Sequence, residues 1–119
     1  MLELDLDSGS VTRRLATGKG PYNLAVSPDG EHLAVSFKGD QATGVFDLGT
    51  GMARIARNTR RIPHGVVISP DSRFAFVSLE GIGGEPGTVD VIDLASAEVV
   101  ASVEMGKQAG GIGFWKMER

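Results

Sequence analysis

The side chains in this sequence that are best suited to bind a ligand or to catalyse a reaction are one histidine and the arginines in the segment before it. His64 can accept a proton near neutral pH, ligate a metal or haem, or bind an anion. Four arginines precede it, and their forked guanidinium groups match carboxylate and phosphate: Arg54, Arg57, Arg60 and Arg61. The pattern predicts a segment that attracts a small anionic ligand, and a solvated loop of surface charge is the alternative interpretation.

Other catalytic arrangements are absent from the sequence. There are no cysteines, so thiolate nucleophiles and cysteine-based metal sites are excluded. Neither Ser69 nor Ser78 lies in a G-x-S-x-G string, and the glycine-rich segment 81–87 lacks the spacing of a phosphate-binding loop. A histidine without clustered carboxylates makes a poor metal site. We therefore predict no catalytic residue, no metal and no cofactor.

Three aspartates that could be taken for catalytic carboxylates occupy the same position in a repeated sequence pattern. Asp5, Asp47 and Asp93 each begin the pattern D-L-x-[ST]-[GA], at intervals of 42 and 46 residues. In such a turn the Asp and the Ser or Thr bond nearby backbone amides. The recurrence therefore predicts a structural role for these carboxylates.

A second string keeps the same register. Residues 21–30, PYNLAVSPDG, recur 42 residues later at 63–72 as PHGVVISPDS. The four extra residues of the longer interval fit the glycine-rich segment 81–87, and residues 109–114 then form a third copy. Two independent markers in one register establish an internal repeat.

Each repeat is predicted to form four short strands separated by tight turns. The 17 glycines and the alternating apolar residues favour strands, about eleven in all, and no helix. Pro28 and Gly30 predict a type I turn closed by a glycine bulge, whereas Ser72 in the second copy implies mild strain or a different turn. Four antiparallel strands every 40–45 residues are typical of a β-propeller blade, and a β-sandwich is the less economical alternative.

The sequence therefore predicts an all-β protein of about two and a half to three propeller blades in an incomplete ring. The single repeat region, 1–119, divides into a partial blade at 1–17, blades at 21–58 and 63–104, and a final strand at 109–117. Trp115 is expected to pack at the blade interface or to cap the end. Because closed rings have about four to eight blades, we expect either the C-terminal part of a longer propeller or copies associating through open blade edges.

The SPDG and V-x-V-I-D-L strings resemble the YVTN-type β-propeller repeat family. The similarity covers residues 21–36, 45–51, 63–78 and 89–103. It implies a propeller fold, and the family includes lactonase-like enzymes and carriers of haem or copper. Members are often periplasmic or exported, but residues 1–5 do not begin a signal peptide, so the compartment is not predicted.

In a propeller, the residues that lead into the innermost strand border the central channel. We therefore predict a ligand-binding rim formed by Tyr22, Arg60, Arg61 and His64, with a structural role for His64 as the alternative. The formal charge of −3 argues against nucleic acid, and no apolar run approaches a membrane span. The predicted function is a non-catalytic surface that binds a protein or a small anion. The alternative is part of a lactonase-like hydrolase with its site in the channel.

Overall fold

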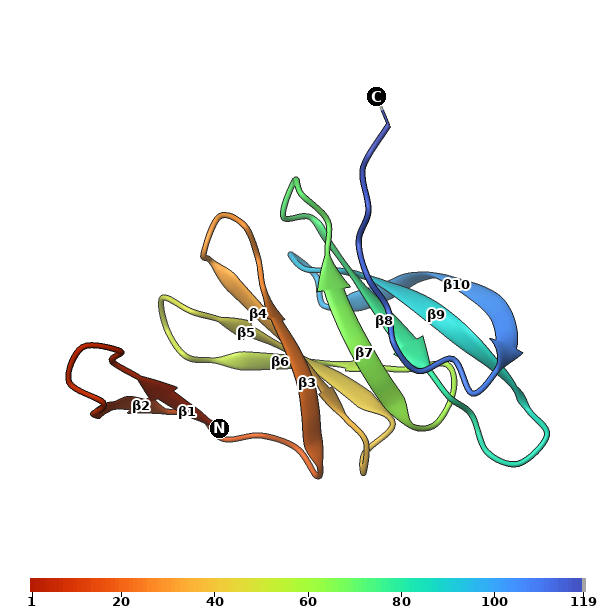
Figure 1. Ribbon diagram of the computed structural model, residues 1–119, viewed down its shortest axis with the longest axis horizontal. Helices are drawn as coiled ribbons and strands as arrows, with labels where there is room; N and C mark the ends of the chain where they lie inside the picture. The colour runs from red at the N-terminus through yellow and green to blue at the C-terminus, as the bar shows by residue number, and fades with distance from the viewer. Residues whose placement is uncertain (119) are drawn as a thin grey trace.

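The computed structural model describes residues 1–118, which form ten strands and no helix (Figure 1). A hairpin of β1 (Leu2–Leu4) and β2 (Val11–Arg14) precedes two four-stranded antiparallel sheets. The first sheet contains β3 (Pro21–Val26), β4 (His32–Phe37), β5 (Ala42–Asp47) and β6 (Ala53–Arg57). The second contains β7 (Pro63–Ile68), β8 (Phe74–Leu79), β9 (Pro86–Asp93) and β10 (Glu98–Lys107). The prediction of four-stranded antiparallel blades is confirmed.

The hairpin and the two sheets follow one another in an open arc (Figure 1). Within each sheet every strand pairs with the next one along the chain, and the first strand of the second sheet packs on β3 and β4 of the first. The innermost strands β3 and β7 therefore lie side by side, and the outermost strands β6 and β10 also meet. None of residues 1–118 belongs to a helix long and apolar enough to cross a membrane.

The core lies between successive blades because a strand points alternate side chains to opposite faces of its sheet. On β4, Val35 and Phe37 face the N-terminal hairpin and pack with Leu15 and Phe46, whereas Ala34 faces the second sheet. There it joins a second buried cluster that includes Val45, Val66, Val77, Leu79 and Ile92. Each full blade thus depends on its neighbour for burial of an apolar face.

The SPD turns have the same backbone conformation in both blades. Gly30 has a φ of 78° and Ser72 a φ of 60°, so the second copy keeps the turn with a serine in the left-handed region. This outcome matches the strained alternative, since a non-glycine residue is unfavourable there. The Ser72 hydroxyl accepts a hydrogen bond from the Asp29 amide at 3.1 Å, which links the turns of the two blades.

The repeated aspartates serve the turns, as predicted. Asp5, Asp47 and Asp93 each accept a hydrogen bond from the amide three residues on, at 2.7, 2.8 and 2.9 Å respectively. These bonds, together with those from the Ser or Thr hydroxyls, hold the pKa of each carboxyl below its ordinary value. The residue that closes each turn is Gly9, Gly51 or Ala97, all at positive φ.

The prediction of a final strand at 109–117 is wrong, because no part of that segment is in a strand. Its first residues nevertheless lie where an inner strand would lie: the Ser78 hydroxyl donates to the Gly110 carbonyl, just as the Ser36 hydroxyl donates to that of His64. An inner strand pairs with the second strand of its own blade, and residues 1–118 hold no such partner for it. Strand β10 also extends to Lys107, beyond the predicted end of the blade at 104, and Trp115 is 89% exposed rather than packed.

Candidate ligand site at the rim

Tyr22 and His64 occupy the same place in the two blades and meet across the blade junction. Their ring centroids lie 4.5 Å apart with an interplanar angle of 57°. The Nζ atom of Lys38 lies 4.0 Å from the Tyr22 ring centroid and 3.2 Å from Oε1 of Glu80. The same Glu80 oxygen is 3.4 Å from Nε2 of His64. We call Tyr22, Lys38, His64 and Glu80 the rim cluster.

The repeat explains why these four side chains meet. Tyr22 and His64 are 42 residues apart, and so are Lys38 and Glu80, which directly follow β4 and β8. Equivalent positions of successive blades lie next to each other, so opposite charges there form an ion pair across the junction. Lys38 was not among the predicted site residues, although it lies one 42-residue repeat before Glu80. The Nδ1 atom of His64 is buried and has no hydrogen-bond partner among residues 1–118.

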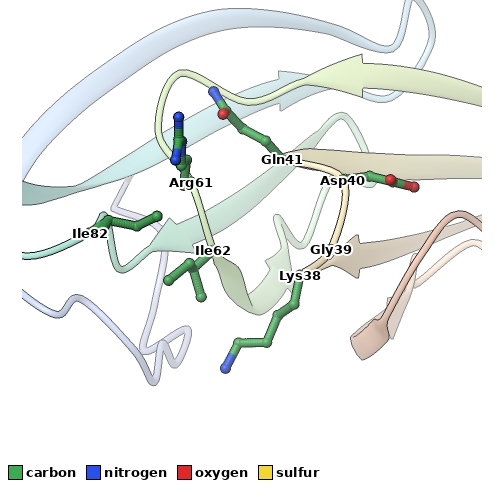
Figure 2. Close-up of a pocket in the computed structure, with 7 residues that line it drawn as sticks. All are labelled: Lys38, Gly39, Asp40, Gln41, Arg61, Ile62 and Ile82. Carbon is green, nitrogen blue, oxygen red and sulfur yellow. The ribbon is translucent and has the colours of Figure 1, made fainter.

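Next to the rim cluster lies a cavity of about 390 Å³ (Figure 2). Its lining residues come from three loops and are Lys38, Gly39, Asp40, Gln41, Arg61, Ile62 and Ile82. The side chains of Arg61 and Gln41 point the same way, whereas the Asp40 carboxylate points away from them. Its Oδ2 atom accepts a hydrogen bond from the Lys19 amide at 2.6 Å. The cavity thus combines a cationic edge with an isoleucine wall.

The structure does not bring all four predicted site residues together. Tyr22 and His64 are together in the rim cluster, while Arg61 lines the neighbouring cavity beside Lys38. Arg61 is exposed, and its side chain makes no hydrogen bond or ion pair with another described residue. Arg60 does not line the cavity; it is half-buried, and its Nε atom is buried without a partner. Of the two arginines, Arg61 is the one available to a ligand in this cavity.

A buried polar network holds the loop that carries Arg61. The Asp90 carboxylate is fully buried and accepts hydrogen bonds from Asn58 Nδ2 at 3.1 Å, the Thr59 amide at 2.8 Å and the Thr59 hydroxyl at 2.6 Å. Asn58 in turn accepts a bond from the Thr43 hydroxyl at 2.9 Å. These bonds tie the loop between β6 and β7 to both sheets. The guanidinium of Arg61 therefore projects from an anchored backbone.

Ile62 follows in an unusual conformation. Its φ is 60°, and the equivalent residue of the preceding blade is Gly20 at 62°. The Ile62 carbonyl accepts a hydrogen bond from the Glu80 amide at 3.1 Å, as the Gly20 carbonyl does from the Lys38 amide at 2.9 Å. A β-branched residue in the left-handed region is strained, and such strain concentrates at functional sites. Here the strained residue is also a wall of the cavity.

Comparison with models of known protein families finds no match, and neither does comparison with curated proteins. Solved structures of other proteins are similar in fold to this chain. Hydrazine synthase of Kuenenia stuttgartiensis superposes with a TM-score of 0.78 at 28% identity, over 87% of this chain and 30% of that chain. The β-propeller domain of Myceliophteria thermophila Cps50 (Swd1) gives 0.68 at 17% identity, over 82% and 30%. A functionally unknown protein of Desulfotomaculum acetoxidans gives 0.70 at 13% identity, over 86% and 32%.

This chain is a segment of a β-propeller. It spans about a third of the length of each of the three similar chains. The two four-stranded sheets are its blades, and the rim cluster lies beside β3 and β7, the innermost strands.

A basic residue recurs at each blade junction of this propeller segment. Lys19, Arg61 and Lys107 each lie two residues before the inner-strand position, and all three are exposed. The carbonyls of Lys19 and Arg61 accept equivalent hydrogen bonds, from the amides of Gly39 at 3.1 Å and Gly81 at 3.0 Å. The basic side chain is common to all three copies, whereas the residue that follows it is Gly20, Ile62 or Gln108. Neither Lys19 nor Lys107 was among the predicted site residues.

Proposed function

We propose that this propeller segment is a non-catalytic binding module that takes a small anionic ligand at the channel rim. One observation carries the proposal: a basic side chain recurs at all three blade junctions, and at the central junction it lines a cavity of about 390 Å³. A ring of such residues concentrates positive potential at the channel mouth, although the chain as a whole has a net charge of −3. A carboxylate or phosphate is the complementary ligand group.

The residues of the cavity suggest how the ligand is held. The Arg61 guanidinium has no protein partner among residues 1–118 and can donate two parallel hydrogen bonds to a carboxylate. Lys38 supplies a second charge, which Glu80 partly offsets at 3.2 Å. Ile62 and Ile82 add apolar surface to the lining of the same cavity. This combination suits a carboxylate with a short apolar chain better than a bare inorganic anion.

We also propose that the repeats are of the YVTN type, because an SPD string forms a turn in both blades, and V-x-V-I-D-L at 89–94 and its shorter counterpart V-F-D-L at 45–48 end β9 and β5. The lactonase-like alternative requires a histidine and several carboxylates that converge on one substrate. The rim cluster brings one histidine to one carboxylate, and that carboxylate already binds Lys38. Binding is therefore the function that the geometry supports best.

Calorimetric titration with inorganic phosphate and with carboxylates from acetate to hexanoate tests the proposal. We expect affinity to rise with chain length as the chain covers the isoleucine wall. Arg61→Ala should weaken binding by at least tenfold, because hydrogen bonds to a charged group contribute about 1.5–3 kcal/mol. Arg14→Ala, which removes an exposed arginine from β2, is the matched control. Equal loss in both variants, or no binding to the unaltered protein at millimolar concentrations, would overturn the proposal.

A further inference from the structure

Three acidic side chains lie beside His32 in the first blade, at the end of the strands opposite the rim cluster. The SPD turn between β3 and β4 carries Asp29 and Glu31, and His32 is the first residue of β4. One ligand atom from each of these three side chains lies within 4.8 Å of the other two. Asp47 pairs with His32 in the strand register, and both residues line a cavity of about 510 Å³ together with Glu31. We call Asp29, Glu31, His32 and Asp47 the His32 cluster.

Hydrogen bonds fix the two turns that carry these carboxylates. The Asp29 Oδ1 atom accepts bonds from the Ser27 hydroxyl at 2.5 Å and the Glu31 amide at 3.0 Å. The amide of Leu48, which follows Asp47, donates to the Glu31 carbonyl at 2.8 Å and so joins the two turns. The Glu31 carboxylate itself is exposed and makes no hydrogen bond or ion pair with another described residue. Its oxygens are therefore available to a ligand.

His32 has a ring nitrogen without a partner. Its Nδ1 atom is buried and makes no hydrogen bond with any of residues 1–118. Such an atom is unusual, because most buried polar groups in folded proteins are paired. The His32 amide donates to the Ser27 hydroxyl at 2.9 Å, which fixes the backbone beside the turn. A neutral imidazole held in this way is suited to bind a metal ion, for which histidine is the commonest protein ligand.

The second blade has a cation of its own at the equivalent place. Arg73 stands there at the position of Glu31. Hydrogen bonds from serines of the turns lower the pKa of both Asp71 and Asp93, and the positive charge of Arg73 lowers it further. These aspartates are the counterparts of the two in the His32 cluster, whose carboxylates form no ion pair with a Lys or Arg among residues 1–118. The first blade therefore lacks a cation where the second has one.

The His32 cluster stays accessible when another blade precedes it. The second blade has such a neighbour, namely the first blade, and its equivalent residues show the effect. Asp71 and Arg73 remain exposed there, and Phe74 and Asp93 are only partly buried. The same positions of the first blade are therefore open to solvent in a longer propeller as well.

We propose that the His32 cluster binds one divalent transition-metal ion through His32, Asp29 and Glu31, with Asp47 as a further carboxylate beside it. One imidazole nitrogen and several carboxylate oxygens suit Zn²⁺ or Mn²⁺, whereas Ca²⁺ and Mg²⁺ prefer oxygen ligands alone. Ligand distances of about 2.0–2.2 Å place opposite ligand atoms roughly 4 Å apart, and the exposed Glu31 side chain can close the remaining gap. The prediction of no metal from the sequence concerned His64, whereas His32 has the clustered carboxylates that a metal site requires.

Zn²⁺, added alone as its chloride, is the probe. Titration calorimetry should show one ion bound per chain, and the thermal midpoint should rise with Zn²⁺ concentration, because an ion that binds the folded state stabilises it. His32 and His64 are the two histidines of the sequence, so the NMR signals of their ring protons can be followed separately. We expect the His32 signals to shift on addition of Zn²⁺ and the His64 signals to stay in place.

Matched variants identify the ligands. Glu31→Gln and His32→Asn should each weaken Zn²⁺ binding by at least about tenfold, because the loss of even an outer partner of a metal ligand costs about 10–100-fold. Glu31 is exposed, so Glu31→Gln tests the site without disturbing the core. Glu98→Gln, which removes an exposed acid outside the cluster, should bind like the unaltered protein. No binding at millimolar Zn²⁺, a response of the His64 signals in place of those of His32, or equal losses in Glu31→Gln and Glu98→Gln would each overturn the proposal.

Discussion

Replacement of the buried carboxylate at the blade junction should weaken the fold and release the loop that carries Arg61. Asp90 accepts three hydrogen bonds, one from Asn58 and two from Thr59. Asp90→Ala removes the acceptor for all three. Asn58 is only 4% exposed, so its amide group cannot turn to bulk water, whereas exposed Thr59 can be rehydrated.

The size of the effect follows from these exposures. A buried donor without a partner costs about 1–3 kcal/mol, and each rehydrated bond loses about 0.5–1.5 kcal/mol. The sum for Asp90→Ala is on the order of 3 kcal/mol of unfolding free energy. Asp90→Asn should cost only about 1 kcal/mol, because the amide oxygen still accepts and the Thr59 hydroxyl can rotate to accept from the new amide.

Urea unfolding followed by circular dichroism measures both values. With a slope of about 1–3 kcal/mol per molar urea, Asp90→Ala should lower the midpoint by roughly 1–3 M. Binding of carboxylates, measured below the unfolding transition, should also weaken in Asp90→Ala, because the loop that presents Arg61 loses its anchor. Equal destabilisation by the two substitutions, or a loss below about 1 kcal/mol for Asp90→Ala, would refute the assignment of this network as the anchor.

Two further predictions concern the turns and the core. Hydrogen bonds from Thr50 lower the pKa of Asp47, so the unfolded chain binds more protons than the folded protein below about pH 4, and the free energy of unfolding falls there. Asp47→Asn should therefore flatten the dependence of the urea midpoint on pH between pH 5 and pH 2. An unchanged dependence would contradict this prediction. Gly44→Ala should lower the free energy of unfolding by about 1–3 kcal/mol, because the new Cβ atom would lie 2.5 Å from the buried Phe37 ring. Gly84→Ala should leave the free energy of unfolding unchanged or raise it, because no other atom lies within 4 Å of its Cβ position. Equal thermal midpoints for the two alanine variants would contradict the packing argument.

The internal register made much of the fold predictable from sequence. In the SPD and D-L-x-[ST]-[GA] strings a side chain bonds a backbone amide two or three residues away. The local sequence is therefore enough to predict these turns. The conformation of the turn at Ser72 could not be predicted in this way. The sequence left two conformations open, and the hydrogen bond between Ser72 and Asp29 joins two different blades.

The candidate site was only partly predictable, because it is built from contacts between blades. Tyr22 and His64 could be placed by their register, but the pairing of Lys38 with Glu80 depends on side chains that meet across a junction. Asp90 lies in a strand with regular alternation, and its buried role requires Asn58 from the loop before β7. The final strand was predicted from its similarity to earlier repeats, whereas strand formation depends on a pairing partner.

The hydrogen bonds between blades have a consequence for the growth of such a chain. Near the inner strands, Ser36 donates to the His64 carbonyl, and Ser78 donates to the Gly110 carbonyl. On the outer strands, Arg13 donates to the Leu48 carbonyl, and Arg54 donates to the Leu94 carbonyl. Each repeat therefore carries the donor for the next repeat and the acceptor for the one before. An in-frame tandem duplication of one 42-residue unit would supply both halves of these junction bonds at once. The gene can lengthen by recombination without first evolving a new interface.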